Sequence, residues 1–230
     1  MAYQSSIHSG DKQRKQPGHH AVVAVEDLTP TAYILRFERE GIDFEPGQHI
    51  LLGEVGRSQM REYSIYSGKE DPYLEVLVRE VKDGLVSRRL RKLKPGMMLK
   101  VEPPVGFFTL PFQRLPHDRF LFIASGTGIA PFHSFLRSYD DMDYLLVHGI
   151  RYANERFGAE SYDPERYITC TSRDEQGHYQ GRLTSWLKHQ AVEDIAMVYL
   201  CGNYGMILEA MDILRTKGIR ENQMHAEVYF

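Results

Sequence analysis

The sequence predicts two domains, an antiparallel β-barrel followed by an α/β domain with a mostly parallel sheet. Between residues 20 and 110 the apolar residues repeat with a period of mostly two, and turn signals such as Pro46-Gly47 and Asp71-Pro72 separate the short segments. From about residue 115 apolar strands alternate with segments of helical period. A chain of 230 residues is long enough for two small domains.

The first domain is predicted to span residues 19–114. Short strands are expected at 21–25, 33–37, 49–52, 63–66 and 74–78. Antiparallel strands at such spacing are typical of barrels and sandwiches, and we predict a barrel. One short helix is expected at about 86–93, before the turn at Pro95-Gly96. Residues 1–18, rich in Ser, Gln, Lys and Gly, are expected to form a flexible arm.

The second domain is predicted to span residues 115–230, beyond a linker marked by Pro111 and Pro116. Strands are expected at 120–124, 144–150, 167–171 and 197–201, and helices at 131–138, 182–189 and 205–217. The last helix places Ile207, Ala210, Met211 and Leu214 on one face, and Gly218 suits the position after its end. Alternating strands and helices imply a parallel sheet that is covered on both faces.

Composition excludes several classes of function. A net charge of −3 gives no overall electrostatic reason to bind nucleic acid or an anionic membrane. No apolar run approaches the roughly 20 residues of a membrane helix, and the first 20 residues lack the apolar core of a secretory signal, so a cytoplasmic location is expected. Two cysteines cannot supply the four thiolates of an iron–sulfur cluster, and the histidines lack metal-ligand spacing, so no metal site is expected.

The most informative motif lies within residues 119–136. An apolar run at 120–124 stops at Gly126-Thr127-Gly128, and a helical segment begins at about Pro131. A strand, a glycine turn and a helix in this order direct backbone N–H groups at a phosphate. Pro131 stands where the last glycine of G-x-G-x-x-G would be, and proline is tolerated in a first helical turn. On its own this motif is a weak signal.

Several motifs in a fixed order resemble the ferredoxin–NADP reductase superfamily. They are Arg61-Glu62-Tyr63-Ser64, Gly126 to Pro131, Cys201-Gly202-Asn203 and Glu227-Val228-Tyr229-Phe230. The aromatic residue after the tyrosine is similar to the bacterial branch, and the resemblance runs from about residue 20 to residue 230. It implies an FAD-binding barrel, an NADP(H)-binding α/β domain, hydride transfer to flavin N5 and single-electron exchange with a ferredoxin or flavodoxin.

The resemblance assigns a set of residues to FAD. It implies that Tyr63 stacks on the flavin, Arg61 meets the pyrophosphate and Ser64 bonds flavin N5. The remaining FAD residues that it implies are Val78, Arg79, Gly84, Leu85, Val86, Ser87, Thr127 and Phe230. Ser87 is equally well explained as the N-cap of the short helix.

A second set is assigned to NADP(H). The resemblance implies that Gly126, Thr127 and Gly128 hold the diphosphate, and that an arginine group with one serine holds the 2′-phosphate, to which arginine forks are suited. The members of that group are Arg151, Ser172, Arg173 and Arg182. Asp174 is a carboxylate of the kind that favours NAD(H), and we favour NADP(H).

The catalytic residues implied by the resemblance are Ser64, Cys201, Glu227 and Tyr229. Cys201 is expected beside the nicotinamide with Gly202 and Asn203, although free cysteines are usually small buried hydrophobes. Tyr229 is expected to cover the flavin until the nicotinamide displaces it.

A basic cluster follows the FAD segments, and it consists of Arg88, Arg89, Arg91, Lys92 and Lys94. One hypothesis is that it steers an acidic ferredoxin or flavodoxin; the other is an ordinary solvated helix face.

Two further functions of the chain stay open at this point. One is an NAD(P)H-dependent reductase of free flavin, or the flavin subunit of a larger oxygenase or dehydrogenase. The other, from another class, is a non-catalytic nucleotide-binding module.

Overall fold

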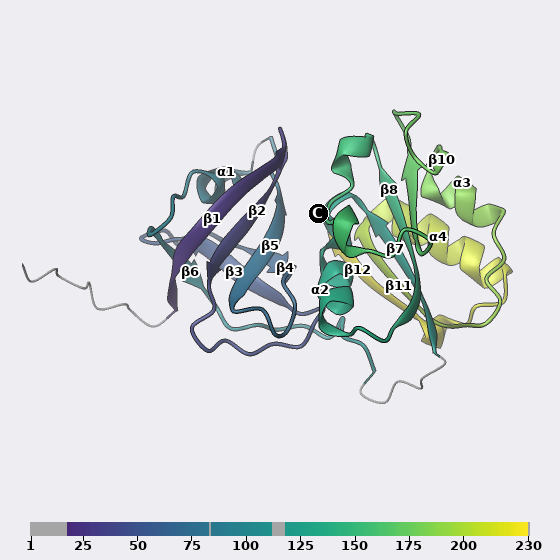
Figure 1. The fold of residues 1–230 in the computed structure, drawn as a ribbon, viewed down its shortest axis with the longest axis horizontal. Coiled ribbons are helices and arrows are strands. Elements are labelled where there is room, and N and C mark those ends of the chain that lie inside the picture. The colour runs from purple at the N-terminus through teal and green to yellow at the C-terminus, as the bar shows by residue number, and fades with distance from the viewer. Residues whose placement is uncertain (1–17, 83, 112–117, 230) are drawn as a thin grey trace, which may run out of the picture.

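The protein consists of two domains that lie side by side, each built on one six-stranded sheet (Figure 1). The structure is a computed structural model, and it describes residues 18–82, 84–111 and 118–229. The first sheet is antiparallel and the second is parallel, which confirms the predicted fold class. Most of the predicted N-terminal arm, and Phe230, lie outside the described residues.

The first sheet closes into a barrel, and the short helix α1 (Leu85–Arg91) packs Val86 and Leu90 against its core. Its strands are β1 (His19–Thr29), β2 (Ala32–Glu38), β3 (His49–Glu54), β4 (Met60–Ser64), β5 (Tyr73–Arg79) and β6 (Met98–Val101). They follow the order β4-β3-β6-β1-β2-β5. Beyond β4 the chain bridges back to β5, where Ile65 faces Val76 and the Tyr66 N–H donates to the Glu75 carbonyl at 2.7 Å. The two ends of the sheet are therefore joined.

Two elements of this domain differ from the expectation. Strand β4 runs from Met60 to Ser64, whereas a strand at 63–66 was expected. Strand β6 was not predicted, because its four residues carry a lysine and lie between a glycine turn and Pro103-Pro104. It nevertheless lies in the middle of the sheet, because it pairs with both β1 and β3.

The second sheet has the order β10-β9-β8-β7-β11-β12, and every neighbouring pair is parallel. Its strands are β7 (Arg119–Ser125), β8 (Asp143–Ile150), β9 (Tyr167–Thr171), β10 (Tyr179–Gln180), β11 (Ile195–Asn203) and β12 (Met224–Tyr229). Its α-helices are α2 (Ala130–Ser138), α3 (Leu183–Lys188) and α4 (Tyr204–Thr216). In α4, Ile207, Ala210 and Leu214 are buried and Met211 is half-buried against the core, and Gly218 follows the helix end with a φ of 89°, as predicted.

Helix α2 contacts the barrel domain and stabilises the arrangement of the two domains. Its His133 donates from Nδ1 to the Tyr66 carbonyl at 2.7 Å, and its Arg137 binds Asp71 at 2.7 Å. The His133 ring also stacks on the Tyr66 ring with a centroid distance of 3.7 Å. Burial lowers the pKa of His133 to about 4, so the ring is neutral at pH 7. The histidine thus has a structural role at the boundary between the domains.

An aromatic core continues across the same boundary. Phe108, from the segment after β6, packs against Phe132 and Phe135 of α2 and against Tyr199 of β11. Because one buried cluster contains residues of both domains, their relative orientation is fixed by packing as well as by hydrogen bonds.

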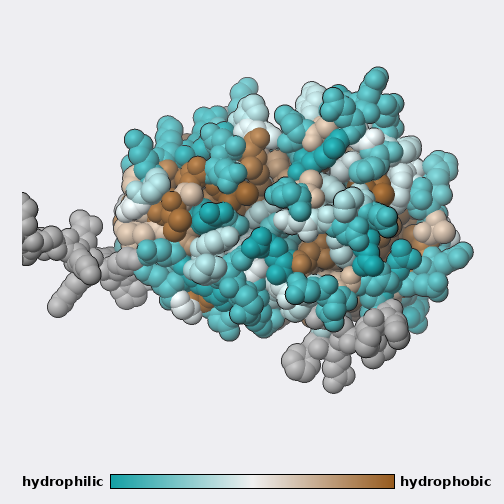
Figure 2. All heavy atoms as spheres, in the orientation of Figure 1, coloured by the Kyte–Doolittle hydropathy of each residue, from teal (hydrophilic) through white to brown (hydrophobic). Residues whose placement is uncertain are grey.

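The surface is mostly hydrophilic in the view of Figure 2, with an apolar area over the barrel where β1 lies in Figure 1. Val23 of this strand is 42% exposed. Scattered exposed apolar side chains are normal on folded proteins. None of the helices in the described ranges combines the length and the apolar character needed to cross a bilayer.

Candidate active site

A cleft of about 1220 Å³ lies between the two domains. On one side it is lined by β3, β4 and α1, and on the other by residues that follow the carboxyl ends of the parallel strands. Ligands of parallel sheets bind at this edge. The volume exceeds the roughly 300–1,000 Å³ of a typical single-ligand pocket, so the cleft has room for more than one ligand.

Most of the predicted site residues line this interdomain cleft. They are Arg61, Tyr63, Ser64, Arg79, Gly84, Leu85, Val86, Ser87, Gly126, Thr127, Arg151, Ser172, Arg182, Gly202, Asn203, Glu227 and Tyr229. Four other predicted residues within the described ranges do not line it: Val78, Gly128, Arg173 and Cys201. Val78 is fully buried in the barrel core, because it points inward from β5.

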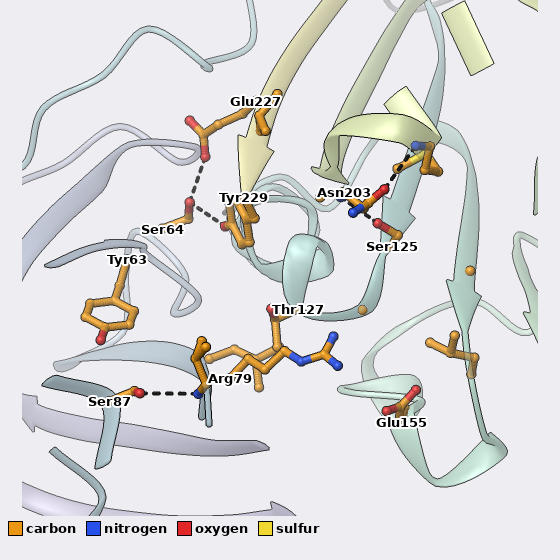
Figure 3. A pocket seen from close by; sticks show the side chains of 18 of the residues that line it. Tyr63, Ser64, Arg79, Ser87, Ser125, Thr127, Glu155, Asn203, Glu227 and Tyr229 are labelled. Atoms are coloured by element: carbon orange, nitrogen blue, oxygen red, sulfur yellow. Dashed lines mark hydrogen bonds between the residues drawn. The ribbon is translucent and has the colours of Figure 1, made fainter. Parts of the chain in front are cut away.

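A chain of hydrogen bonds crosses the cleft between β12 and β4 (Figure 3). The Tyr229 hydroxyl donates to Ser64 Oγ at 2.6 Å, and Ser64 Oγ donates to Glu227 Oε1 at 2.8 Å. Burial raises the pKa of the Glu227 carboxyl, and the bond from Ser64 opposes this shift. The catalytic residues predicted at this point, apart from Cys201, therefore meet as one connected group.

Cys201 lies behind this group. It pairs in register with Glu227, and its side chain is fully buried. Burial raises the pKa of the Cys201 thiol well above its usual value, so the sulfur stays protonated, and it interacts with Tyr229. Cys201 does not line the cleft while Tyr229 contacts it, and its predicted place beside the nicotinamide stays a prediction.

The barrel side of the cleft offers a flat aromatic ring and several cations. Tyr63 lines the cleft with Arg61 beside it on β4, and Arg79 ends β5. The first turn of α1 contains no acidic residue, and among the described residues no side chain caps its N–H groups. This donor set suits a diphosphate, and an exposed aromatic face suits a planar ring, so the residues present fit FAD.

Ser87 has a different local role from the N-cap that was considered. Gly84 occupies the N-cap position, and Ser87 lies inside the first turn of α1. Its Oγ accepts from the Val81 N–H and donates to the Gly84 carbonyl, each at 3.4 Å. The serine therefore links the segment before α1 to the first turn of the helix.

The glycine turn is itself a short 3₁₀ helix, Gly126–Ile129, that leads into α2. Gly126 has a φ of 55°, a conformation that favours glycine. Gly128 does not face the cleft, because a Cβ there would lie 2.4 Å from the Cys201 carbonyl oxygen. Gly128 is thus required for close packing on β11, which is a different reason from the ligand contact that was expected.

The far end of the cleft combines cations and carboxylates. Arg151, Ser172 and Arg182 line it as predicted, but Arg173 is exposed outside it and only pairs its N–H with the Arg151 carbonyl at 2.9 Å. Arg173 follows β9 by two residues and continues the strand pairing beside Arg151. Its place in the anion site stays a prediction.

Two carboxylates at this end were not predicted. Glu155 accepts from the Arg151 N–H at 2.8 Å, and Glu209 pairs with Lys188 at 3.2 Å. Both line the cleft. By contrast, Asp174 is not part of the lining, and its carboxylate accepts from the Ala153 N–H at 2.8 Å. This bond and others from the loop backbone lower the pKa of Asp174.

Comparison with known proteins agrees with this geometry. Residues 20–110 match the family described as the oxidoreductase FAD-binding domain, and residues 122–212 match the oxidoreductase NAD-binding domain. The flavodoxin/ferredoxin–NADP reductase of Rhodobacter capsulatus is 30% identical to this chain, over 89% of this chain and 88% of that protein. This chain belongs to the ferredoxin–NADP reductase family.

Two more distant similarities place this family member in a wider group. The toluate 1,2-dioxygenase electron transfer component of Pseudomonas putida is 24% identical, over 94% of this chain and 68% of that protein. A ferredoxin NADP⁺ reductase from Neisseria gonorrhoeae, solved with bound FAD and NADP, superposes with a TM-score of 0.80 at 21% identity. The matched region covers 92% of this chain and 98% of that chain, which shows that the fold is shared.

In this member of the ferredoxin–NADP reductase family, one residue of the predicted basic cluster has a structural role. The Arg91 guanidinium binds Asp27 at 2.9 Å and Glu80 at 3.2 Å. Arg88 and Arg89 make longer ion pairs of 3.6 and 3.8 Å, and Lys92 is exposed. Arg91 is therefore a structural residue, which we exclude from the docking hypothesis.

Within the part of the chain that the structure describes, no group of His, Cys, Asp or Glu side chains is arranged to hold a metal ion.

Proposed function

We propose that this chain is an FAD-dependent reductase that passes electrons between NADP(H) and a ferredoxin or flavodoxin. The observation that carries the proposal is the continuity of one cleft from Tyr63 and Ser64 of the barrel to Gly126, Thr127 and Arg182 of the second domain. A flavin and a nicotinamide nucleotide can meet only where two such sites share one space. The name of the relative from Rhodobacter capsulatus supports the same activity.

The barrel residues hold FAD. Tyr63 stacks against its flat ring system, and Arg61, Arg79 and the free N–H groups at the start of α1 neutralise its diphosphate. When bound, FAD supplies the redox chemistry, since it accepts two electrons with a hydride from NADPH and gives them up singly to two carrier molecules, with release of one proton. The protein contributes orientation, electrostatics and the exclusion of water.

Ser64, Glu227 and Tyr229 lie where the flavin and the nicotinamide meet. The Tyr229 ring leaves its place between the domains so that the nicotinamide can enter, and Cys201 behind it then lines the site. The Ser64 hydroxyl donates to Glu227 Oε1 at 2.8 Å, so it could relay a proton: it would give its own proton to this carboxylate as it takes another from a group bound in the cleft. Burial raises the pKa of Glu227, which favours the carboxyl as a proton acceptor in this relay.

The second domain holds NADP(H). The Thr127 N–H and its neighbours in the glycine turn receive the diphosphate, and Arg151, Ser172 and Arg182 receive the 2′-phosphate. Glu155 and Glu209 reduce the positive charge at this end. The site therefore binds NADP(H) more tightly than NAD(H), and these two carboxylates reduce the difference in affinity.

Arg88, Arg89 and Lys92 steer an acidic carrier protein toward the cleft. Among the described residues their side chains make no ion pair closer than 3.6 Å, and α1, which carries the two arginines, lines the cleft. Opposite charge on a carrier would raise the association rate at low ionic strength.

A second candidate is the electron-transfer component of an oxygenase. The similarity to the toluate 1,2-dioxygenase electron transfer component supports it, and the chemistry at the cleft would be the same. Retention of Tyr63, Ser64, Glu227 and Tyr229 in one connected site argues against a non-catalytic nucleotide-binding module.

The test is to purify the protein, load it with FAD, and follow bleaching of the flavin absorbance with NADPH and with NADH. Reoxidation is then measured with a panel of ferredoxins, flavodoxins and free flavin. Fast reoxidation by a ferredoxin or flavodoxin supports the main proposal. A protein that takes up no FAD would refute it, and reoxidation by free flavin alone would reassign the acceptor.

A further inference from the structure

The imidazole of His148 connects the glycine turn to the centre of the parallel sheet. His148 lies on β8 opposite Ala124 of β7, and its side chain is fully buried. Its Nε2 lies 2.8 Å from the Gly126 carbonyl oxygen, and its Nδ1 lies 2.8 Å from the Tyr167 hydroxyl. No role in the proposed chemistry requires this side chain.

These contacts define which nitrogen carries the proton. A carbonyl oxygen can only accept, so Nε2 carries the hydrogen and donates it to Gly126. Nδ1 is then free to accept from the Tyr167 hydroxyl. Burial lowers the pKa of His148 to about 4, so the ring is neutral at pH 7 and both contacts are satisfied together.

The bond to Gly126 also sets the direction of the next N–H. The peptide between Gly126 and Thr127 is trans, and in a trans peptide the C=O and the N–H point in opposite directions. Since the Gly126 carbonyl points at His148, the Thr127 N–H points away from it. Thr127 is the second residue of the 3₁₀ turn, where an N–H has no partner within the helix, and it lines the cleft.

The opposite side of the turn is held independently. Ser125 Oγ accepts from the Asn203 N–H at 2.8 Å, and a Cβ on Gly202 would lie 2.3 Å from that oxygen. The turn is thus fixed by β11 on one side and by His148 on the other. Of the side-chain hydrogen bonds in the described parts of the chain, the one from His148 acts on the peptide that presents the Thr127 N–H.

We propose that His148 is a positioning residue for the diphosphate of the nicotinamide nucleotide: it holds the Gly126–Thr127 peptide so that the Thr127 N–H points into the cleft. This inference rests on the proposed function for the ligand, but the orientation of the N–H is a property of the protein alone. Tyr167 supports the arrangement by fixing the ring from the other side.

The first experiment measures the direction of the Thr127 N–H in the protein without nucleotide, by its residual dipolar coupling in NMR. His148→Leu removes the donor, whereas His148→Gln replaces Nε2 with an amide N–H. We expect the coupling to change in His148→Leu and to return close to the wild-type value in His148→Gln. An unchanged coupling in His148→Leu would overturn the proposal.

The second experiment compares two ligands by calorimetry. NADP⁺ carries the diphosphate, whereas 2′-AMP carries only the 2′-phosphate end. Loss of one hydrogen-bonded support predicts about three- to tenfold weaker NADP⁺ binding in His148→Leu, with 2′-AMP affinity unchanged. Tyr167→Phe, which keeps the ring, should weaken NADP⁺ about twofold by the same principle.

The outcomes separate this inference from the proposed function. Equal losses for NADP⁺ and 2′-AMP in His148→Leu and Tyr167→Phe would show a general structural effect and overturn the positioning role. Unchanged NADP⁺ affinity in His148→Leu would also overturn it. A wild-type protein that bound neither nucleotide would refute the proposed function, and with it the diphosphate part of this inference.

Discussion

The Tyr229 hydroxyl donates a 2.6 Å hydrogen bond to Ser64 Oγ, so the last described strand of the second domain is tied to the barrel across the cleft. The bond joins residues that are 165 positions apart in the sequence. The Tyr229 side chain also contacts the buried Cys201. We propose that the tyrosine ring closes the nicotinamide end of the site, so that an entering nucleotide has to displace it.

Replacing Tyr229 with Ser should therefore tighten NADP⁺ binding to the FAD-loaded protein, because no ring then has to be displaced. Tyr229→Phe is the matched control: it keeps the ring and loses only the hydroxyl, whose hydrogen bond is worth about 0.5–1.5 kcal/mol. Calorimetric titration of both variants measures the effect. Weaker NADP⁺ binding in Tyr229→Ser than in Tyr229→Phe would contradict the displacement model.

The neutral, buried His133 predicts a loss of stability in acid. Its pKa is lowered to about 4 in the folded state, whereas an unfolded histidine titrates near 6.5. A lowered pKa contributes stability that is fully present above about pH 6.5 and is lost as the pH falls toward 4. His148 adds the same dependence.

Urea unfolding of the wild type and of His133→Phe between pH 7 and pH 4 checks this expectation. Phe preserves the stacking on Tyr66 but cannot be protonated, so its stability should fall less steeply than that of the wild type over this range. His133→Phe should also be less stable at pH 7, because the Tyr66 carbonyl loses its donor. Parallel pH profiles would contradict the assignment.

Glu209 should reduce the difference in affinity between NADP⁺ and NAD⁺. Its carboxylate lies at the end of the cleft where Arg182 is exposed. Glu209→Gln removes a negative charge there, so affinity for NADP⁺ should rise about two- to fivefold while affinity for NAD⁺ changes less. The gain should shrink at high salt, because exposed charges are screened.

Arg182→Gln supplies the opposite control, because it should reduce NADP⁺ affinity and leave NAD⁺ nearly unaffected. Equal shifts for both nucleotides in Glu209→Gln would mean that this carboxylate does not sense the 2′-phosphate.

Reversal of charge on Arg89 and Lys92 tests the docking hypothesis. Substituting both with Glu should slow electron transfer to a ferredoxin severalfold at low salt, and the difference should fade as salt is added. Reduction of ferricyanide, which needs no protein docking, is the control and should be unchanged. A similar loss with both acceptors would place the effect on the flavin site instead.

The sequence was sufficient for those parts of the protein whose signals are local. The change from period two to alternating strands and helices predicted both sheets, and the Arg61–Ser64 and Gly126–Pro131 motifs predicted residues that line the cleft. Strand β6 escaped prediction, because its four residues owe their conformation to β1 and β3 on either side.

The remaining site features depend on contacts between distant segments. Arg173 was predicted in the anion site, but it does not line the cleft, and its backbone pairs with that of Arg151. Glu209 enters the lining only because α4 starts at the end of β11. His148 reaches Gly126 because β7 and β8 pair in a particular register, which no single segment specifies.

The most direct test of the account is stopped-flow reduction of the FAD-loaded protein by NADPH and NADH, followed by mixing with oxidised ferredoxin or flavodoxin. The account predicts rapid bleaching of the flavin absorbance with NADPH, slower bleaching with NADH, and reoxidation by at least one of the two carriers. Bleaching that is as fast with NADH as with NADPH would contradict the roles of Arg151 and Arg182. Failure of every carrier to reoxidise the reduced protein would contradict the central claim.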